Sequence, residues 1–318
     1  MHKKYMLKFP GRLAVPAVVA VAVLAAILLW PADTENQNIP GMQVFNVIFG
    51  HGGAPLQDPS VVAVGLKGEV IVADSGSKRI LVFADNGEYL YSFSGPGSGL
   101  AELEQPIALA VGPDGDIYVA DSSKEAVIVF SSAGEYRYRI TGPEGFIPSG
   151  VVVAEDGIPI IFNEADLKLY AYSPETKELQ SVFGETEKKS PSMLLGNMFW
   201  DPGSEKIFAI DRKMKQVAVI KKGMVVDSWG WDYLDIPGGI AYDRSNNLVF
   251  VSDTARSRIV VFSSDGSYVG EFGSGGEGKE SFNSPGGLAM DQRGRLYVAD
   301  RGNDRVVIYS SKGLSEQQ

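Results

Sequence analysis

Short apolar runs alternate with turn residues along most of the chain, from about residue 58 to the C-terminal end. One stretch shows the pattern clearly. Its runs are IALAVG (107–112), DIYVAD (116–121), AVIVFS (126–131) and YRYRIT (136–141). Turns of the type Pro-Asp-Gly and Ser-Ala-Gly separate them, so the pattern predicts four short antiparallel strands with no helix between them.

The same four-strand unit recurs along the chain, and one polar residue marks each copy. An Asp or Asn closes the second run of each unit, at Asp74, Asp121, Asn163, Asp211, Asp253 and Asp300. Neighbouring markers are 42 to 48 residues apart. A repeat of this length that contains four strands is typical of a β-propeller blade.

The two ends of the repeat region complement each other. The last unit supplies three runs (286–291, 295–300 and 305–310) and lacks a fourth. The segment before the first unit, VFNVIFGHGG (44–53), looks like the fourth run of another unit, YVGEFGSGG (268–276). We therefore predict an all-β, six-bladed propeller of four-stranded antiparallel blades. The N-terminal strand completes the last blade, which removes two exposed sheet edges.

The N-terminal segment has a different pattern. Residues 13–30 carry no charge, and as a helix they would be about 27 Å long, enough to span a membrane. The residues before them are basic and those after them acidic and polar, so the positive-inside rule puts the propeller on the extracytoplasmic side. A cleaved signal peptide is the alternative, but cleavage after Ala32 would need a small residue at Trp30. The predicted organisation is a basic cytoplasmic tail (1–12), a transmembrane signal-anchor helix (13–30), a linker (31–42), the propeller (43–312) and a C-terminal tail (313–318).

Composition narrows the chemistry. The formal net charge is −10, which disfavours nucleic acid as a partner. The chain has no Cys, which excludes disulfides, thiolate metal sites and a Cys nucleophile. It has two His, His2 and His51, too few for a three-His zinc site. A Ser-His-Asp triad would have to use His51.

The repeated motif resembles the NHL repeat. The motif P-x-G-[IL]-A…L-x-V-[AS]-D…R-[IV]-x-[IV]-[FY] is clearest at 237–262 and 285–309, good at 59–83 and 106–130, and weaker at 148–172 and 191–220. This resemblance implies a six-bladed propeller that acts as a binding module.

Enzymes with similar repeats or folds define the alternative function. The resemblance implies metal-binding His near the axis for a peptide-amidating lyase, and Glu, Asn and Asp around a calcium for a lactonase or esterase. In this chain no His falls on a blade strand, and Asn197 is the one polar exception on otherwise apolar inner strands. We therefore predict no catalytic, cofactor-binding or metal-binding residue and no cofactor. A metal-dependent lyase, lactonase or esterase is kept as the alternative.

The repeated polar residues are interpreted as structural, because a residue that recurs once per blade serves the blade. Arg follows the Asp five residues later in three units, as Asp74/Arg79, Asp253/Arg258 and Asp300/Arg305. We expect these carboxylates, with Asp121 and Asp211, to accept backbone N–H groups of the next turn and to pair with Arg where it is present.

Function is sought where the units differ from one another. The turns between second and third runs share one face with the long unit-to-unit loops, and these turns are net basic. The loop WGWDYLDIP (229–237) places Trp231 and Tyr233 beyond the end of a strand. We predict that these two aromatics bind a partner, within a rim of Lys213, Arg256 and Arg301. The alternative is that both aromatics plug the axis or pack on the next blade.

These features predict a membrane-anchored propeller on the periplasmic or extracellular side of the cell. Its expected partner is a protein or peptide of the cell envelope, with a glycan as a second partner class. A role in the assembly of envelope proteins fits this placement. A nucleic-acid-binding NHL module is the least favoured alternative.

Overall fold

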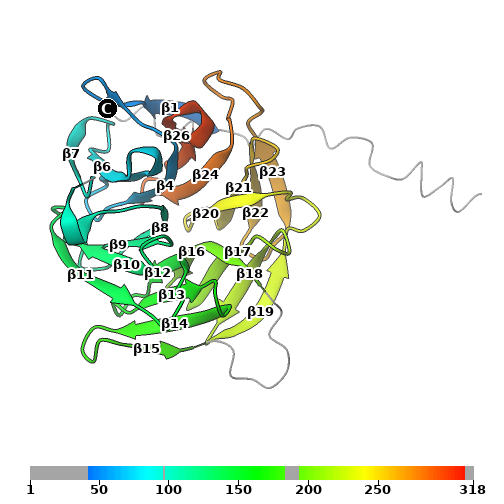
Figure 1. The fold of residues 1–318 in the computed structure, drawn as a ribbon. Coiled ribbons are helices and arrows are strands. Elements are labelled where there is room, and N and C mark those ends of the chain that lie inside the picture. The colour runs from blue at the N-terminus through cyan, green and yellow to red at the C-terminus, as the bar shows by residue number, and fades with distance from the viewer. Residues whose placement is uncertain (1–41, 96, 183–192, 312–318) are drawn as a thin grey trace, which may run out of the picture. The chain divides into compact units, whose positions relative to one another are not determined.

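A computed structural model of the protein describes residues 42–95, 97–182 and 193–311, and these residues form a six-bladed β-propeller. Each blade is a four-stranded antiparallel sheet, and the six blades follow one another round a ring (Figure 1). The fold predicted from the repeat is therefore confirmed. A short hairpin of β2 (Gly50–His51) and β3 (Ala54–Pro55) precedes the first blade.

In blades 1 to 5 the strands run outward from the axis in sequence order, and blade 6 takes its outer strand from the N-terminal side. Blade 1 consists of β4 (Pro59–Val64), β5 (Val70–Asp74), β6 (Arg79–Phe83) and β7 (Tyr89–Phe93), and blade 2 of β8 (Pro106–Val111), β9 (Ile117–Asp121), β10 (Ala126–Phe130) and β11 (Tyr136–Thr141). Blade 3 consists of β12 (Pro148–Val153), β13 (Pro159–Asn163), β14 (Lys168–Ser173) and β15 (Glu178–Ser181), and blade 4 of β16 (Leu195–Asp201), β17 (Lys206–Asp211), β18 (Gln216–Lys221) and β19 (Met224–Trp229). Blade 5 consists of β20 (Pro237–Asp243), β21 (Leu248–Asp253), β22 (Arg258–Ser263) and β23 (Tyr268–Phe272), and blade 6 of β24 (Pro285–Met290), β25 (Leu296–Asp300), β26 (Arg305–Ser311) and β1 (Met42–Ile48). Three 3₁₀ turns, η1 (Ser75–Ser77), η2 (Gly99–Ala101) and η3 (Arg301–Asn303), lie in the connections.

The first described strand closes the ring. β1 pairs antiparallel with β26, from Met42 opposite Ser311 to Ile48 opposite Val306. Figure 1 shows the blue β1 beside the red β26. The last blade is therefore built from both ends of the chain, as the sequence predicts, and its outer strand comes from the N-terminal side.

The hydrophobic core lies between the blades. Six clusters of buried side chains each join the facing sheets of two neighbouring blades. Middle strands pack on both faces, so β9 and β10 are buried at every position, and such strands read as continuous apolar runs. The outer strand β11 instead alternates between half-buried and exposed residues over most of its length, as a strand with one solvated face does.

The predicted membrane anchor, residues 13–30, lies outside the described residues. So do the predicted cytoplasmic tail and nearly all of the predicted linker, because the description begins at residue 42. Within the part of the chain that the structure describes, no helix is long and apolar enough to cross a membrane.

Candidate binding face

The turns between second and third strands and the loops that enter each blade lie on the same face of the propeller. Antiparallel pairing brings the end of one strand beside the start of the other. In blade 1, for example, Asp74 at the end of β5 lies opposite Pro59 at the start of β4. We call this side of the propeller the loop face. It carries all the residues that the sequence predicts for partner binding.

A buried carboxylate or amide at the end of each second strand fixes the loop face. Each accepts a backbone N–H from the loop that enters its own blade. The N···O distances are 2.5 Å from Gln57 to Asp74, 3.0 Å from Gln105 to Asp121, 2.8 Å from Ile147 to Asn163, 3.2 Å from Leu194 to Asp211, 3.2 Å from Ile236 to Asp253 and 2.7 Å from Asn283 to Asp300. Five of the six inner strands begin with Pro, which has no N–H to extend the ladder. The Asp or Asn side chain at the end of the second strand therefore accepts the backbone N–H that lies one or two residues before the inner strand.

Arginine joins this carboxylate in three blades. The distances from Arg Nε to Asp Oδ2 are 3.0 Å for Arg79 and Asp74, 3.5 Å for Arg258 and Asp253, and 2.7 Å for Arg305 and Asp300. Arg305 also donates to three carbonyls of the loop that enters blade 6. In the structure these repeated residues hold the loops in place.

A cavity of about 320 Å³ opens on the loop face at the propeller axis, and residues of all six blades line it. Three of its polar side chains each tie one blade to the next. Ser149 Oγ donates to the Leu195 carbonyl at 2.8 Å, Asn197 Nδ2 to the Gly238 carbonyl at 2.8 Å, and Ser60 Oγ to the Pro106 carbonyl at 3.0 Å. These groups therefore stabilise the ring.

Asn197, the polar exception on the inner strands, is thus one of these ties between blades. Among the described residues, no three His, Asp or Glu side chains are grouped so that they could hold a metal ion. His51 lies on the β2–β3 hairpin, where its ring stacks on Tyr89 with centroids 3.9 Å apart. It is not among the residues that line the axial cavity.

Basic side chains of the loop face pair with acids from neighbouring loops. Lys215 Nζ lies 2.6 Å from Asp235 Oδ1, and its hydrogen bond holds the pKa of that carboxyl below the ordinary value. Arg212 pairs with Glu164 at 2.6 Å. Arg301 donates two hydrogen bonds to the Asp58 carboxylate, at 2.9 and 3.0 Å. These cations are neutralised on the face itself, although the turns are net basic in sequence.

Three exposed apolar side chains lie on neighbouring loops of blades 4 and 5, and one of them lines the axial cavity. Trp231 and Ile236, on the loop between blades 4 and 5, are each 55% exposed, and Met214 on the adjacent turn is 52% exposed. The Lys215–Asp235 pair holds that turn against the loop, and Ile236 also lines the axial cavity. We call Met214, Trp231 and Ile236 the apolar patch. Met214 has a signal in the sequence, since it is one apolar residue in an otherwise basic turn.

Tyr233 behaves differently from Trp231. Its ring stacks on Tyr268 of blade 5, with centroids 4.4 Å apart and planes 7° apart. Its carbonyl accepts hydrogen bonds from Arg256 at 2.9 Å and Arg258 at 2.7 Å. Sequence reasoning treated the two aromatics as one anchor. In the structure Tyr233 packs on the next blade, as the alternative interpretation expects. Trp231 is exposed on the loop that Tyr233 holds in place.

The three predicted rim residues lie on different blades. Lys213 is exposed in the second-to-third turn of blade 4, and Arg256 is exposed in the corresponding turn of blade 5. Arg301 lines the axial cavity from blade 6. Lys213 thus lies on the turn that carries Met214, Arg256 bonds to the loop that carries Trp231, and Arg301 lies at the mouth of the axial cavity.

Comparison with known proteins agrees with the repeat and the fold. Residues 234–262 and 282–309 match the NHL repeat. No curated protein matches the sequence. Similar solved structures include a catalytically inactive His-to-Ala form of virginiamycin B lyase from Staphylococcus aureus with quinupristin (12% identity, 85% of this chain and 89% of that chain, TM-score 0.60), an auxiliary nutrient binding protein from Bacteroides ovatus (13%, 85% and 72%, 0.64) and Kuenenia stuttgartiensis hydrazine synthase (15%, 81% and 97%, 0.59). At such identities the likeness shows the fold alone.

Proposed function

We propose that this propeller is a binding scaffold of the cell envelope that presents its loop face to a protein or peptide partner and supports the assembly of envelope proteins. The apolar patch carries the proposal. Its Trp231 is more than half exposed on a loop that ion pairs, hydrogen bonds and stacking hold in place. Exposed apolar clusters mark interaction sites, and Trp is enriched at the centres of interfaces. The axial cavity beside the patch can receive a partner side chain.

Charges near the patch favour a polypeptide over nucleic acid. A phosphate backbone needs uncompensated cations, but Lys215 and Arg301 already lie against Asp235 and Asp58. A polypeptide can instead cover the aliphatic members of the patch and exchange ion pairs at its rim. A glycan would use Trp231 and gain little from Met214 and Ile236, so it is the second partner class.

We also propose that residues 13–30 anchor the propeller on the extracytoplasmic side of a membrane. The uncharged run and the basic residues before it support this orientation. A C-terminal alkaline phosphatase fusion, which is active only after export, should be active. A fusion to a reporter that is active only in the cytoplasm should be inactive. The opposite pair of results would contradict the orientation.

Replacing Trp231 with Ala should reduce recovery of the partner at least about tenfold, because a hot-spot Trp contributes 2 kcal/mol or more on truncation. Its melting temperature should change by less than about 2 °C, since the indole contributes little to the fold. The measurement is quantitative co-purification from solubilised membranes, with circular dichroism melts of the same variants.

Two matched variants make this result specific. Phe49 is also more than half exposed, so Phe49→Ala removes a comparable aromatic and should leave recovery unchanged. Tyr233→Ala removes the stack on Tyr268 and should lower the melting temperature by about 3–6 °C, because it costs roughly 1–2 kcal/mol. Unchanged recovery for Trp231→Ala would show that the apolar patch is not the binding site.

A further inference from the structure

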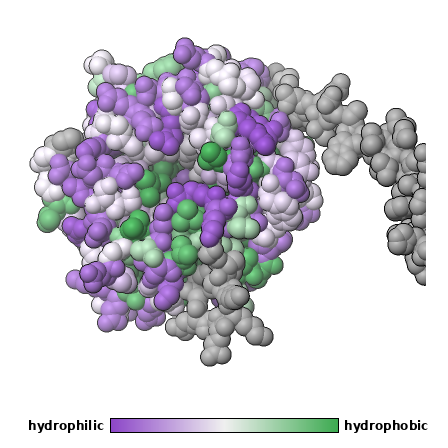
Figure 2. Space-filling view, turned by 45° about the vertical axis from the view of Figure 1, so that its right-hand side comes forward, coloured by the Kyte–Doolittle hydropathy of each residue, from purple (hydrophilic) through white to green (hydrophobic). Residues whose placement is uncertain are grey.

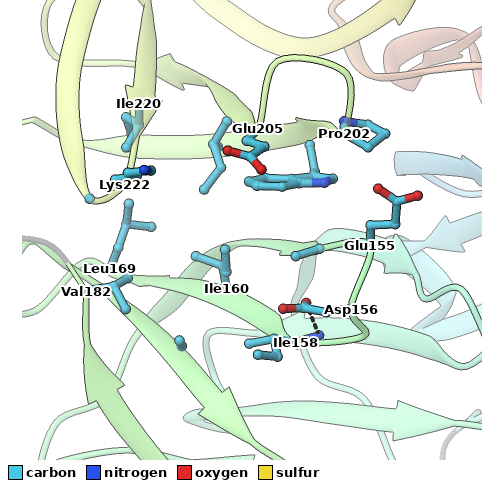
Figure 3. Close-up of a pocket in the computed structure, with 15 residues that line it drawn as sticks. Glu155, Asp156, Ile158, Ile160, Leu169, Val182, Pro202, Glu205, Ile220 and Lys222 are labelled. Atoms are coloured by element: carbon cyan, nitrogen blue, oxygen red, sulfur yellow. Dashed lines mark hydrogen bonds between the residues drawn. The ribbon is translucent and has the colours of Figure 1, made fainter.

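A large cavity lies between blades 3 and 4. Its volume is about 640 Å³, which is in the range of small-molecule sites. Figure 3 shows Ile158, Ile160 and Leu169 of blade 3 facing Pro202, Glu205 and Ile220 of blade 4 across it. The cavity reaches the turns between first and second strands, on the side opposite the loop face. We call it the seam cavity.

The sequence of these two blades creates the seam cavity. Ile220, at the end of the third strand of blade 4, stands where the other five blades have Phe83, Phe130, Tyr172, Phe262 and Tyr309. Ala209, which is buried behind the cavity wall in the same core cluster as Ile220, stands where they have Val72, Val119, Ile161, Val251 and Val298. On the facing blade, Ala171 replaces a Val or Ile found in every other blade.

Aromatic residues occupy the position of Ile220 in the other five blades. Between blades 1 and 2, for example, Phe130 packs against Phe93 with ring centroids 4.8 Å apart. Protein interiors are close-packed, so several truncations at one seam leave space that neighbours do not recover. The other five seams do not combine these truncations, so the cavity is a local feature of one seam.

The mouth of the seam cavity is acidic. Three acids line it: Glu155 and Asp156 on the turn between β12 and β13, and Glu205 on the turn between β16 and β17. Lys222 is the one basic residue among the residues that line the cavity. All four are exposed, and none of the three acids forms an ion pair with a cation of the described residues. Figure 2, one view of the surface, shows hydrophobic residues only as small groups among hydrophilic ones. The seam cavity therefore combines apolar walls with an acidic mouth, and in this it differs from the apolar patch of the loop face.

We propose that the seam cavity is a binding site for a small amphipathic cation, with an aryl or alkyl body and an ammonium group. Ile160, Leu169 and Ile207 offer an apolar wall to the body. The three carboxylates attract the ammonium group, and the Trp200 ring in the wall adds a surface that favours cations. This site is independent of the loop face.

Three probes of one shape test the charge preference. The full-length chain in lipid nanodiscs is titrated calorimetrically with 4-phenylbutylammonium, 4-phenylbutanol and 4-phenylbutanoate, with empty nanodiscs as the blank. We expect the ammonium probe to bind most tightly and the carboxylate at least about tenfold more weakly. Equal affinities for the three probes, or no saturable binding of the ammonium probe, would overturn the proposal.

Variants locate the binding. The triple variant Glu155→Gln, Asp156→Asn and Glu205→Gln should weaken the ammonium probe about five- to tenfold and leave the alcohol unchanged. Glu88→Gln, which removes an exposed acid from a turn of blade 1 on the same side, should change neither. An equal loss with Glu88→Gln would show general attraction to an acidic protein, and would overturn the proposal.

Filling the cavity should block the site. Ile220→Phe restores the residue type of the other five blades, so we expect it to abolish binding of the alcohol and the ammonium probe and to raise the melting temperature by about 2–5 °C. Ala171→Val fills the cavity from the opposite wall and should also weaken binding. Intact binding in both variants would show that the probes bind elsewhere. No binding to the parent chain, together with a lower melting temperature in both variants, would show that this seam holds no open site.

Discussion

A chain that lacks β1 should fail to form a stable propeller. Ile48 is almost fully buried, and Val44 and Val47 pack against the core between blades 5 and 6. Burying these side chains contributes about 3–6 kcal/mol, a large part of the roughly 5–15 kcal/mol that stabilises a domain. Loss of β1 also leaves β26 as an unpaired edge. We expect the melting temperature to fall by more than about 10 °C, or the chain to aggregate.

The measurement compares three chains by circular dichroism and light scattering. One begins at Asp33, and the other begins there but lacks residues 42–48. A chain that begins at Gly41 is the control, since it keeps the whole of β1 and should melt like the first. Equal melting of all three would mean that the ring does not depend on closure by the N-terminal strand.

The fold could be read from the sequence because its signals are local. Each blade uses the same alternation of apolar and polar residues and the same types of turn residue. Asp74 and Asp300, for example, close the second strand of blades 1 and 6, although they are 226 residues apart. Closure could also be read, because the surplus run at 44–53 matches the missing run of the last unit. Where signals of this kind repeat six times, errors at one blade do not change the architecture.

The candidate site was less accessible to the sequence, because its contacts join different blades. Nothing near Tyr233 in the sequence shows that Tyr268 lies under its ring. Likewise, the basic turns gave no sign that Arg301 meets Asp58, which stands 243 residues away. Exposure and neutralisation are properties of the assembled ring, so Trp231 and Tyr233 could not be separated before it was known.

The seam cavity had a signal that a search for shared features passes over. Averaging the six units gives the NHL-like motif, in which the end of the third strand is Phe or Tyr. Measured against this motif, blade 4 is simply a weaker copy, because Ile220 is neither Phe nor Tyr. Read blade by blade, the same departure coincides with Ala209 and Ala171 on surfaces that face each other. Deviations from a repeat carry information when several of them meet in space.

The likeness to virginiamycin B lyase, at 12% identity, shows the fold and carries no chemistry to this chain. His51, the one His among the described residues, stacks on Tyr89 and is not among the residues that line the axial cavity. The polar groups at the axis here are bonded to the next blade's carbonyls. A shared propeller fold therefore leaves the function to be inferred from the residues of this chain's own loops and seams.

The repeated carboxylate should be most critical where it balances a buried charge. Asp300 is fully buried, and it accepts hydrogen bonds from Asn283 N, Asn303 Nδ2 and Arg305 Nε, each at 2.7 Å. Arg305 is itself only 5% exposed. Asp300→Ala would leave that guanidinium buried without its counter-ion, which costs about 3–5 kcal/mol and corresponds to a fall of roughly 6–15 °C in melting temperature.

Blade 2 supplies the matched control for this prediction. Asp121 is equally buried and accepts backbone N–H groups of the entering loop, but Ala126 stands where blade 6 has Arg305. Asn can accept the same N–H bonds, as Asn163 does in blade 3. Asp121→Asn should therefore lower the melting temperature by less than about 3 °C, and Asp300→Asn by clearly more, because only the second removes a counter-ion. Equal small losses in thermal melts of the two Asn variants would show that the carboxylate serves as a hydrogen-bond acceptor alone, and that the buried Arg305 finds its compensation in the loop carbonyls it already contacts.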